Sequence, residues 1–556
     1  MATGLKITNP RLITGLLALS MLVVGITGIS YEYTFSKLAS DILGDSIRQW
    51  AITIGLMMLF MGIGADLQKH LSDNRLVEKL ILAQIALGLT GSVGPTFSLF
   101  VFGSYHDFFT LVHYALISFV GFLIGLEIPL LTRINEGYLP DLKENLGLIL
   151  KMDYIGSFIG ALAWVYFFPQ FFDLLETSYF LGLCNLGNGL ILFLLFYSQI
   201  KKPWEPALLV GCSVVLIISM QAQSGSIRVA LEQKLFKDPV VFSKTTPYQR
   251  LILTKKETGE VRLYINGHLQ FSSSDEYIYH EFLVHPALSI SPQAKRVLVL
   301  GGGDGLAVRE ILKYPQVEEI TLIDLDPGMT DLGQTNPDLV ALNGGSLKKA
   351  QVLPAQGITQ GNKQLLTMRG QGYFRRQKQV KDVDVWYYNI DAFSFVQTIP
   401  QSYDVIILDF PDPSDINLSK LYSLEFYKAL KERLTLGGLL IQQSTSPAYA
   451  LEAFLMVGRT MEAAGLSTLA LRENVPSFGQ WGFWLAGHKE IYGNKGLQEK
   501  LMTPQIPDNV QYITPELLLS ASKFGKGKLI SKDSRINQVL EDHLFEVYRK
   551  AWLKLQ

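Results

Sequence analysis

Two short motifs in the second half of the chain place carboxylates directly after apolar runs. GGGDG follows one such run and contains Asp304, and LDFPDP ends another and contains Asp409 and Asp412. Carboxylates gathered at one site can bind an ammonium group and can accept the proton of a second one, whose pKa is near ~10. These residue types and positions predict chemistry on a cationic amine.

Each acid also has a purely structural interpretation. Asp304 could cap the helix that follows it, and Asp409 and Asp412 could be turn residues beside Pro411 and Pro413. We favour function because both motifs are expected at the same edge of one sheet. Ligands bind at that edge, outside the carboxyl ends of parallel strands.

The glycine-rich loop indicates the kind of ligand. It lacks the GxGxxG spacing, and its Asp304 would repel a pyrophosphate, which argues against NAD. The acid suits a ligand that is cationic near its sulfur or amine, such as an S-adenosyl compound. Asp324, which ends the next predicted strand about 20 residues on, can accept the two ribose hydroxyls of a nucleoside.

The elements that must position these residues form an α/β pattern. A strand, the glycine loop, a helix at about 306–313 and a second strand make a βαβ unit. The strands expected in this part of the chain are Val297–Leu300, Glu319–Ile323, Val385–Asn389, Tyr403–Leu408 and Leu439–Gln443. We predict a Rossmann-like, methyltransferase-type doubly wound domain over 291–556.

A small β unit is predicted before this domain, over 246–290. Alternating segments occur at Tyr248–Thr254, Val261–Ile265 and His268–Phe271, and Asn-Gly between the last two is a strong hairpin signal. The segment EYIYHEFLVHPALS that follows is expected to form a helix. A polar stretch at 222–245 is expected to be the linker to the first half.

The first half, 1–221, is predicted to be a transmembrane domain of about seven helices. Hydrophobic residues make up 48% of the whole chain, and they are concentrated before about Gln221. Most of the apolar runs approach the ~20 residues that cross a bilayer. The candidate spans are 11–30, 50–65, 80–103, 108–131, 152–172, 179–198 and 206–221.

Basic residues predict the orientation of these spans. They are abundant before the first run and in alternate gaps, so the positive-inside rule places the N-terminus in the cytoplasm of a bacterial inner-membrane protein. Seven spans would then put the second half outside, whereas the S-adenosyl-type ligand expected from the glycine loop is made in the cytoplasm. Either one run does not cross, with 206–221 the first suspect, or a further crossing is hidden, or the enzyme works outside; we favour a cytoplasmic soluble domain.

Glu127 and Asp153 are ionisable residues within or beside apolar runs. Charge inside a membrane is costly and is often functional. The alternative is that both acids lie near span ends and pair with Arg133 or Lys151.

Six ordered motifs resemble the spermidine synthase family, the polyamine aminopropyltransferases, in a membrane-fused bacterial form. The match covers about Tyr248 to His488. The motifs are YQR at Tyr248–Gln249, DEYIYHE at Asp275–Glu281, GGGDG at Gly301–Gly305, IDLD at Ile323–Asp326, DAF at Asp391–Phe393 and LDFPDP at Leu408–Pro413. The resemblance implies transfer of an aminopropyl group from decarboxylated S-adenosylmethionine to putrescine or a related amine, giving spermidine or another polyamine and methylthioadenosine.

The resemblance also implies which residues contact the adenosyl part of the cosubstrate. These are Gln249, Asp324 and Asp391, and Ala392 next to Asp391 belongs with the substrate-binding residues. No cofactor or metal is implied, because the sulfonium of the cosubstrate is already a good leaving group.

For the amine side, the resemblance assigns His280, Asp304 and Asp412 to binding the ammonium groups. Tyr279 would line the same pocket, and Asp409 would be the catalytic base that accepts the proton of the attacking amine. His280 and Tyr279 rest on the resemblance alone, since either could otherwise pack in the core.

Two segments depart from the family pattern. The catalytic motif continues as DPSDINLSKLYSLEFY, where Asp415 and Glu425 are the candidates to replace an expected acid. The aromatic segment of the diamine pocket reads NVPSFGQWGFWLAG, where Phe478 would stand in without a hydroxyl and Trp481 would shape the same wall. These changes concern the choice of acceptor amine.

A long connection at about 335–384 contains a strongly basic run that includes Arg375, Arg376 and Lys378. It is either a surface that docks on anionic lipid headgroups or a solvated loop. The net charge of -1 argues against nucleic acid as a partner. Cys184 and Cys212 lie in apolar runs and indicate neither a disulfide framework nor a thiolate metal cluster. A homodimer is expected from the resemblance.

Two other functions fit parts of the pattern. The soluble domain could bind polyamines without turnover in a transporter or sensor, with Glu127 and Asp153 along a path. It could also be a methyltransferase of the same fold, although the three loop carboxylates favour a cationic acceptor.

Overall fold

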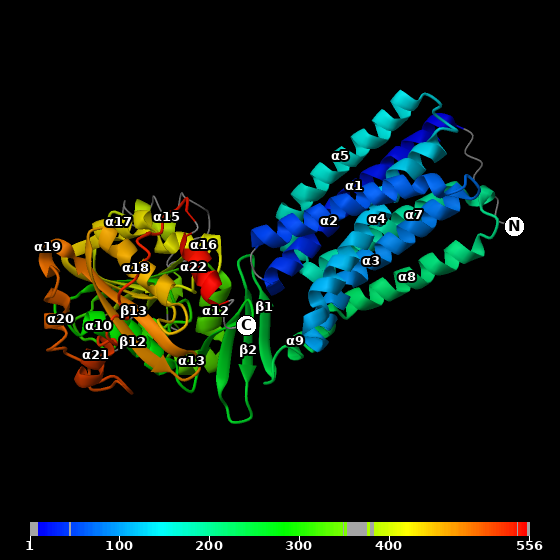
Figure 1. The fold of residues 1–556 in the computed structure, drawn as a ribbon. Coiled ribbons are helices and arrows are strands. Elements are labelled where there is room, and N and C mark those ends of the chain that lie inside the picture. Colours follow the sequence, from blue (N-terminus) through cyan, green and yellow to red (C-terminus); the bar gives the residue numbers. More distant parts are fainter. Residues whose placement is uncertain are drawn as a thin grey trace. The chain divides into compact units, whose positions relative to one another are not determined.

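The computed structural model divides the chain into two compact units, Met1–Val240 and Val241–Gln556 (Figure 1). We call them the helical unit and the α/β unit. The residues that the structure describes are 9–43, 46–347, 350–352, 375–377, 383–541 and 543–552.

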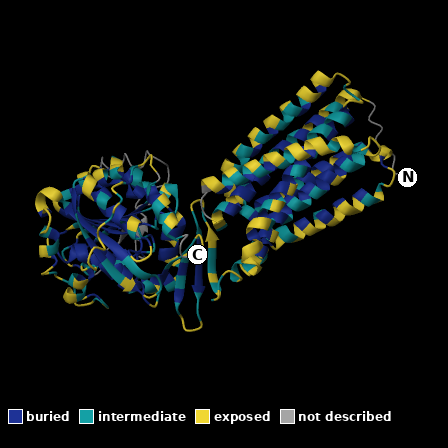
Figure 2. Cartoon of the chain, viewed as in Figure 1, coloured by how far each residue is buried: buried dark blue, intermediate teal, exposed yellow. Residues whose placement is uncertain are grey.

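The helical unit contains seven helices that are long and apolar enough to cross a membrane. They are α1 (Pro10–Leu43), α2 (Ser46–Leu67), α3 (Leu76–Ser104), α4 (Phe109–Asn135), α5 (Leu142–Tyr166), α7 (Leu174–Leu195) and α8 (Trp204–Ala222). Four of them, α1, α3, α4 and α7, are about half buried and form the interior. Figure 2 shows exposed residues along the other three, α2, α5 and α8.

Glycines let several of these helices pack backbone against backbone. A Cβ on Gly125 of α4 would lie 2.1 Å from the Met61 carbonyl oxygen of α2. A Cβ on Gly156 of α5 would lie 2.2 Å from the Leu22 carbonyl oxygen of α1. Small residues at such contacts are typical of helix packing in membranes, where close van der Waals contact replaces the hydrophobic effect.

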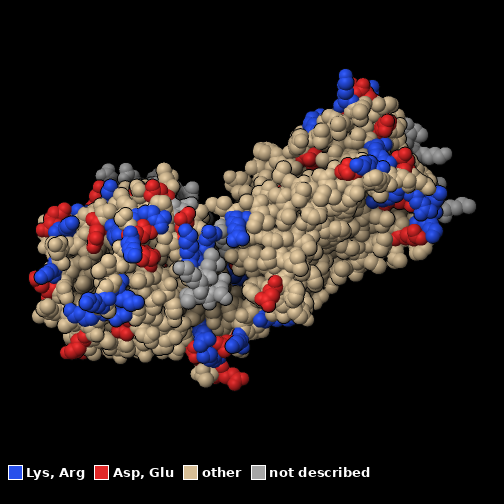
Figure 3. Space-filling model, viewed as in Figure 1, with Lys and Arg blue, Asp and Glu red and all other residues tan. Residues whose placement is uncertain are grey.

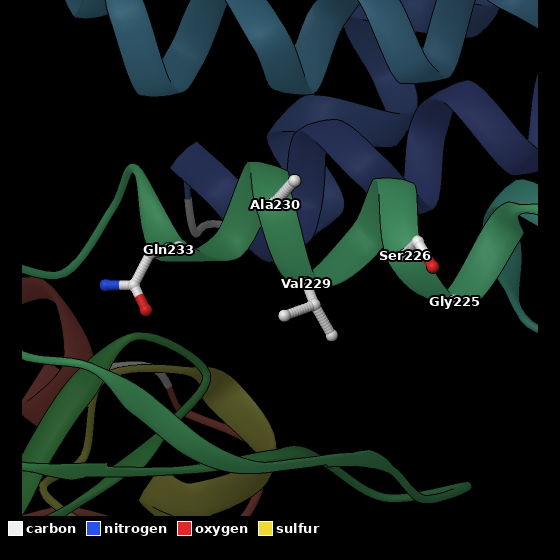
Figure 4. A pocket seen from close by; sticks show the side chains of 5 residues that line it. All are labelled: Gly225, Ser226, Val229, Ala230 and Gln233. Carbon is white, nitrogen blue, oxygen red and sulfur yellow. The ribbon is translucent and has the colours of Figure 1, made fainter.

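The stretch 222–245, expected as a linker, contains regular structure. Helix α9 (Ser224–Gln233) is tied to the helical unit, because Ser224 Oγ donates to Glu176 Oε1 at 2.8 Å. A shallow hollow along one face of α9 is lined by residues none of which is ionisable (Figure 4): Gly225, Ser226, Val229, Ala230 and Gln233. This hollow has none of the groups that the predicted chemistry requires.

The α/β unit opens with a four-stranded sheet in the order β1-β2-β3-β4. Its strands are β1 (Val240–Thr245), β2 (Arg250–Lys255), β3 (Val261–Ile265) and β4 (His268–Ser272). The predicted hairpin is present, and both Asn266 and Gly267 have positive φ, at 50° and 83°. Strand β1 was not predicted, because it lies in the stretch expected as a linker.

The main sheet has seven strands in the order β12-β13-β11-β10-β5-β6-β9. The strands are β5 (Arg296–Gly301), β6 (Glu319–Asp324), β9 (Asp384–Asn389), β10 (Tyr403–Asp409), β11 (Leu434–Gln443), β12 (Leu466–Val475) and β13 (Gly479–His488). β9, β6, β5, β10 and β11 are parallel, whereas β13 and β12 are antiparallel, so the sheet is mixed. The Rossmann-like, methyltransferase-type prediction is confirmed in this form.

Alternate residues of β5 face two separate cores, which explains its unbroken apolar run. Val297 and Val299 pack in one cluster with helix α10 (Glu276–Leu288), and Leu298 and Leu300 pack in the other. The sheet is therefore covered on both faces. The remaining helices are α11 (Leu306–Ile311), α12 (Pro327–Thr335), α13 (Pro337–Leu342), α15 (Ala392–Thr398), α16 (Ile416–Ser419), α17 (Leu424–Arg433), α18 (Leu451–Ala463), α19 (Lys489–Tyr492), α20 (Gly496–Lys500), α21 (Pro515–Ala521) and α22 (His543–Trp552).

The predicted long connection is only partly described. It includes α12, α13 and a small antiparallel pair, β7 (Ala350–Val352) and β8 (Arg375–Gln377). Most of its basic run lies outside the described residues, so docking on lipid headgroups stays a prediction.

Candidate active site

Four adjacent parallel strands of the main sheet end at the same level. Asp409, the last residue of β10, lies opposite Gly301, and Asp324, the last residue of β6, lies opposite Asn389 of β9. Asp304 follows three residues after Gly301. The predicted strand-end acids therefore share one edge of the sheet, because neighbouring parallel strands end in register.

The glycine loop passes directly over two of these acids. A Cβ on Gly301 would lie 2.0 Å from the Asp409 carbonyl oxygen, and one on Gly302 would lie 2.9 Å from Asp409 Oδ2. A Cβ on Gly303 would lie 2.5 Å from Asp324 Oδ2. Gly301 and Gly302 also have positive φ, at 85° and 70°. Only glycine meets both demands, so the loop and the carboxylates form one unit.

Asp409 and Asp304 lie in one electrostatic cluster. The Tyr279 hydroxyl donates to Asp409 Oδ1 at 2.7 Å. Burial raises the pKa of Asp409, and the nearby His280 and the hydrogen bond from Tyr279 partly offset this rise. Burial likewise raises the pKa of Asp304. Desolvated carboxylates of this kind are stabilised when a cation binds beside them.

Asp304 also bonds to the start of a helix, although Gly305 and not Asp304 occupies the N-cap position. Its Oδ1 accepts a hydrogen bond from the Leu306 N–H at 2.9 Å, at the start of α11. The bond uses one oxygen and holds the side chain in place. This bond and ligand binding are therefore compatible for this residue.

His280 is held by a buried ion-pair network that the sequence did not reveal. Its Nδ1 lies 2.7 Å from Glu276 Oε2, and Arg309 contacts both oxygens of Glu276, at 2.7 and 3.0 Å. Burial lowers the pKa of His280, but Glu276, Asp304 and Asp409 raise it to about 9. Since Nδ1 bonds to Glu276, Nε2 is the nitrogen left for a ligand.

Asp412 is positioned by Gln443, the last residue of β11. Gln443 Nε2 lies 3.4 Å from Asp412 Oδ1 and also donates to the Phe410 carbonyl oxygen and to the Tyr422 hydroxyl. Gln443 Oε1 accepts from Trp481 Nε1 at 3.1 Å. Burial raises the pKa of Asp412 to about 6. Gln443 was not predicted from the sequence as a site residue, although its place at the end of a parallel strand was a signal.

An aromatic wall adjoins the acids and contains the segment that departs from the family pattern. The rings of Tyr279 and Phe478 are 6.3 Å apart, and those of Phe478 and Trp481 are 5.2 Å apart. Asp275 ties this segment to α10, because it accepts hydrogen bonds from the Ser477 N–H at 2.6 Å and the Ser477 hydroxyl at 2.9 Å.

Asp324 lies on the other side of the glycine loop. It accepts hydrogen bonds from the N–H groups of Gly303, at 2.9 Å, and Asp326, at 2.8 Å, while burial raises its pKa to about 7. The turn that carries Gln249 is tied to the same strand end, because Thr246 Oγ1 donates to Asp326 Oδ2 at 2.9 Å. Thr246 also bonds to the Gln249 carbonyl oxygen.

Asp391 and Ala392 follow β9, further along the same edge. Asp391 caps α15 through the Ser394 N–H at 2.9 Å and contacts Lys420 Nζ at 3.1 Å. Burial raises the pKa of Asp391, but the bonds from Ser394 and Lys420 outweigh it and lower the pKa. Ala392 is buried as the first residue of α15. The described contacts place this pair beside the acid cluster and not within it.

The acids considered as replacements for the missing family acid have other partners. Asp415 caps α16 through the Leu418 N–H at 2.9 Å, and Glu425 accepts from the Val539 N–H at 3.1 Å. Each bond serves the local backbone. Neither contact connects these carboxylates to the acid cluster.

Within the described residues, Glu281, His285 and Glu310 are spaced like metal ligands. Their acceptors are already occupied by protein donors. Glu281 accepts from the N–H groups of three consecutive residues, 511–513. Glu310 bonds to His285 at 2.9 Å and to Lys313 at 2.6 Å. The cluster therefore reads as a structural network that joins α10, α11 and the C-terminal segment.

The glycine loop, the strand-end acid and the desolvated carboxylates are the features of a Rossmann-like transferase. The family described as "Spermine/spermidine synthase domain" matches residues 276–352 and 356–492. The polyamine aminopropyltransferase of Oceanobacillus iheyensis is 34% identical over 537 residues, which cover 95% of this chain and 96% of that protein. The polyamine aminopropyltransferase of Leptospira interrogans is 35% identical over 540 residues, 97% of this chain and 99% of that protein. This chain belongs to the polyamine aminopropyltransferase family.

These alignments span both units of the chain, and they confirm the predicted aminopropyltransferase. The crystal structure of spermidine synthase from Thermotoga maritima aligns at 21% identity and a TM-score of 0.40, over 52% of this chain and 87% of that one. The relatives do not support a non-catalytic synthase-like domain in a transporter or sensor. They likewise give no support to a methyltransferase.

Proposed function

We propose that this protein transfers the aminopropyl group of decarboxylated S-adenosylmethionine to putrescine or a related diamine. The products would be spermidine, or the corresponding polyamine, and methylthioadenosine. The observation that carries the proposal is the pair of desolvated carboxylates, Asp304 and Asp409, beside a glycine loop that ends near Asp324. A nucleoside on one side of the loop then meets an ammonium group on the other.

The adenosyl side is assigned to the strand ends of β6 and β9. Asp324 would accept hydrogen bonds from the ribose hydroxyls, and Gln249 would contact the same nucleoside from the small sheet, which is tied to this strand end. Asp391 and Ala392 would contact the base. The bond from Lys420 keeps Asp391 ionised and therefore able to accept an N–H of adenine.

The amine side is assigned to Asp304, Asp412, His280 and Asp409. Asp304 and Asp412 would bind ammonium groups through charge-assisted hydrogen bonds. When an ammonium brings the positive charge, His280 would release its Nε2 proton to solvent and accept a hydrogen bond from that ammonium through Nε2. Tyr279 fixes the orientation of Asp409 at 2.7 Å.

The reaction is a displacement at the methylene carbon next to the sulfonium. The amine nitrogen forms a bond to that carbon, the carbon–sulfur bond breaks, and the electron pair neutralises the sulfur to give methylthioadenosine. Asp409 would accept the proton that the attacking nitrogen must lose. Holding both substrates in line supplies a further part of the rate.

An activity assay with a panel of amines tests this function. The purified protein with decarboxylated S-adenosylmethionine and putrescine is expected to release methylthioadenosine and spermidine. Intact S-adenosylmethionine should not replace the donor. Absence of turnover with every di- and polyamine would contradict the proposal.

Phe478→Ala is expected to raise the KM for the acceptor amine about tenfold and to leave the KM for the cosubstrate nearly unchanged. The ring stands between Tyr279 and Trp481, so its removal opens the acceptor side of the pocket. The measurement is steady-state kinetics with each substrate varied in turn. Phe524→Ala is the control and should leave both KM values unchanged. It removes an aromatic ring that stacks on Phe454 and not on Phe478. An equal rise in both KM values for Phe478→Ala would contradict this assignment.

We also propose that the helical unit spans a bilayer, with α1, α3, α4 and α7 inside and α2, α5 and α8 facing lipid. Figure 3 shows Lys and Arg side chains, together with Asp and Glu, gathered at the end of this unit where α1 begins, and the Lys and Arg favour a cytoplasmic N-terminus. If all seven helices cross, the α/β unit follows on the opposite face. Protease protection in oriented vesicles decides between that topology and one in which a helix does not cross.

The homodimer stays a prediction, which light scattering in detergent tests.

A further inference from the structure

The interior of the helical unit contains a fully buried pair of polar side chains. Glu127 on α4 and Gln84 on α3 both have 0% of their surface exposed. Gln84 Nε2 donates to Glu127 Oε2 at 2.9 Å. The pair joins two of the four interior helices.

Each member of this pair has an acceptor without a partner. Glu127 Oε1 and Gln84 Oε1 are both buried and make no hydrogen bond. A buried acceptor that lacks a donor destabilises the folded state, and a charged one does so more strongly. Two neighbouring acceptors of this kind indicate that a hydrogen-bond donor completes the site.

The cation expected from the sequence does not supply that donor. Arg133 is engaged at the end of α4, where it contacts Asp73, the Gln68 side chain at 2.9 Å and the Leu71 carbonyl oxygen at 3.0 Å. Among the described residues, no lysine or arginine forms an ion pair with Glu127 or Asp153. The structure therefore contradicts the pairing of Glu127 with Arg133.

Glu127 and Gln84 also lie far from the ends of their helices, unlike acids at the surface. Glu127 lies eight residues before the last residue of α4, which is about 12 Å from the helix end at 1.5 Å per residue. Gln84 lies equally far from the start of α3. An acid at this depth in an apolar bundle is costly and therefore a candidate functional residue.

The other polar groups described around the pair carry no positive charge. Tyr31 of α1 and Asp153 of α5 are the titratable groups that act on Glu127 electrostatically. Asn185 of α7 donates to the Tyr31 hydroxyl at 2.9 Å and accepts from Thr27 at 2.9 Å. Within the described residues, the surroundings therefore offer no counter-charge, although the Tyr31 hydroxyl, which accepts from Asn185, can itself still donate.

We propose that Glu127 and Gln84 form a second binding site, in the helical unit, for the ammonium group of an amine. The carboxylate would supply the charge, and Glu127 Oε1 and Gln84 Oε1 would accept two N–H groups of the ammonium. A divalent cation fits less well, because Ca²⁺ takes 6–8 oxygen ligands and Mg²⁺ demands octahedral coordination. The choice of an amine rests on the proposed function, since amines are the substrates and products of the α/β unit.

Equilibrium binding of radiolabelled putrescine and spermidine to the full chain in detergent, without the cosubstrate, tests the proposal. We expect one equivalent that depends on Glu127 and a separate one that depends on the α/β unit. Glu127→Gln should weaken the first about tenfold or more and leave aminopropyl transfer unchanged. Asp412→Asn should weaken only the second.

Glu136→Gln is the matched control, because Glu136 is an exposed acid at the end of the same helix. It should change neither equivalent. If the wild-type protein binds amine in a way that depends on Glu127 but shows no aminopropyl transfer, the proposed function is wrong and the second binding site is still supported.

Infrared difference spectroscopy separates an ammonium from a bare proton. Adding amine to the wild type should remove the carbonyl band of a protonated carboxyl, and Glu127→Gln should abolish that change. If the band persists at saturating amine, or if Glu127→Gln binds the same number of equivalents as the wild type, Glu127 holds only a proton and the proposal is wrong.

Discussion

Asp409→Asn is expected to reduce kcat about 10²- to 10⁴-fold, the range that a positioned general base supplies. The amide cannot accept the proton that the attacking nitrogen must lose. The substitution preserves the shape of the side chain, and the Tyr279 hydroxyl, which donates to Asp409 Oδ1 at 2.7 Å, can still bond to the amide oxygen. The loss should therefore appear in kcat, with little change in the KM for the cosubstrate.

Methylthioadenosine release under saturating substrates measures this effect. Asp404→Asn is the matched control, since Asp404 lies on the same strand but accepts the N–H groups of Lys295 and Arg296 at 2.9 and 3.0 Å, near the opposite end. It should retain kcat within a few-fold. If Asp409→Asn keeps more than about a tenth of the wild-type kcat, Asp409 is not the base.

Glu276→Gln is expected to destabilise the protein by about 3–5 kcal/mol, because removing one partner of a buried ion pair leaves the others uncompensated. Both His280 and Arg309 would lose their carboxylate, which each contacts at 2.7 Å. The pKa of His280 should fall from about 9 toward or below its ordinary value of 6.5. The kcat/KM for the amine should fall about tenfold or more, because the ring is no longer held in place.

The pH dependence distinguishes this role from simple packing. Because the folded state raises the pKa of His280, its stabilising contribution is complete below pH 6.5 and is lost as the pH rises through about 9. Thermal unfolding in detergent should follow this trend in the wild type and lose it in Glu276→Gln.

Tyr314→Phe is the control, because it removes a buried hydrogen bond to α10, the helix that carries Glu276. It removes the 2.8 Å contact to His285 Nδ1 and leaves His280 and Glu276 untouched. It should keep the wild-type pH trend. An unchanged trend in Glu276→Gln would show that this carboxylate does not set the charge of His280.

The sequence was sufficient to predict the strand ends of the site. A glycine loop follows the first apolar strand of the sheet, and an acid follows each of two later strands. These residues are expected at one edge of the sheet, because parallel strands align their carboxyl ends. Asp304, Asp324 and Asp409 were found in this way, and the register of β5, β6 and β10 brings them together. The apolar runs likewise indicated seven long helices, because a bilayer-length run needs no partner to be recognised.

Only the tertiary structure decided how these acids are held. Gln443 reaches the LDFPDP loop because β11 pairs with β10, and Glu276 meets Arg309 because α10 packs on α11. Such contacts join residues tens of positions apart, and no local periodicity encodes them. Strand β1, within the segment 222–245, was not predicted for the same reason, since it is recognised by its pairing with β2.

The sequence by itself determined which residue types are present and where: carboxylates at strand ends that suit a cationic substrate, and helices apolar and long enough to cross a membrane. The partners of each acid were decided by the fold. Asp409 lies under glycines that leave room for its carboxylate, Asp391 is paired with Lys420, and Glu127 is left with an unpaired oxygen. The physical reason is that a residue type fixes which bonds a side chain can make, whereas burial and the neighbours brought by packing fix which of them it does make.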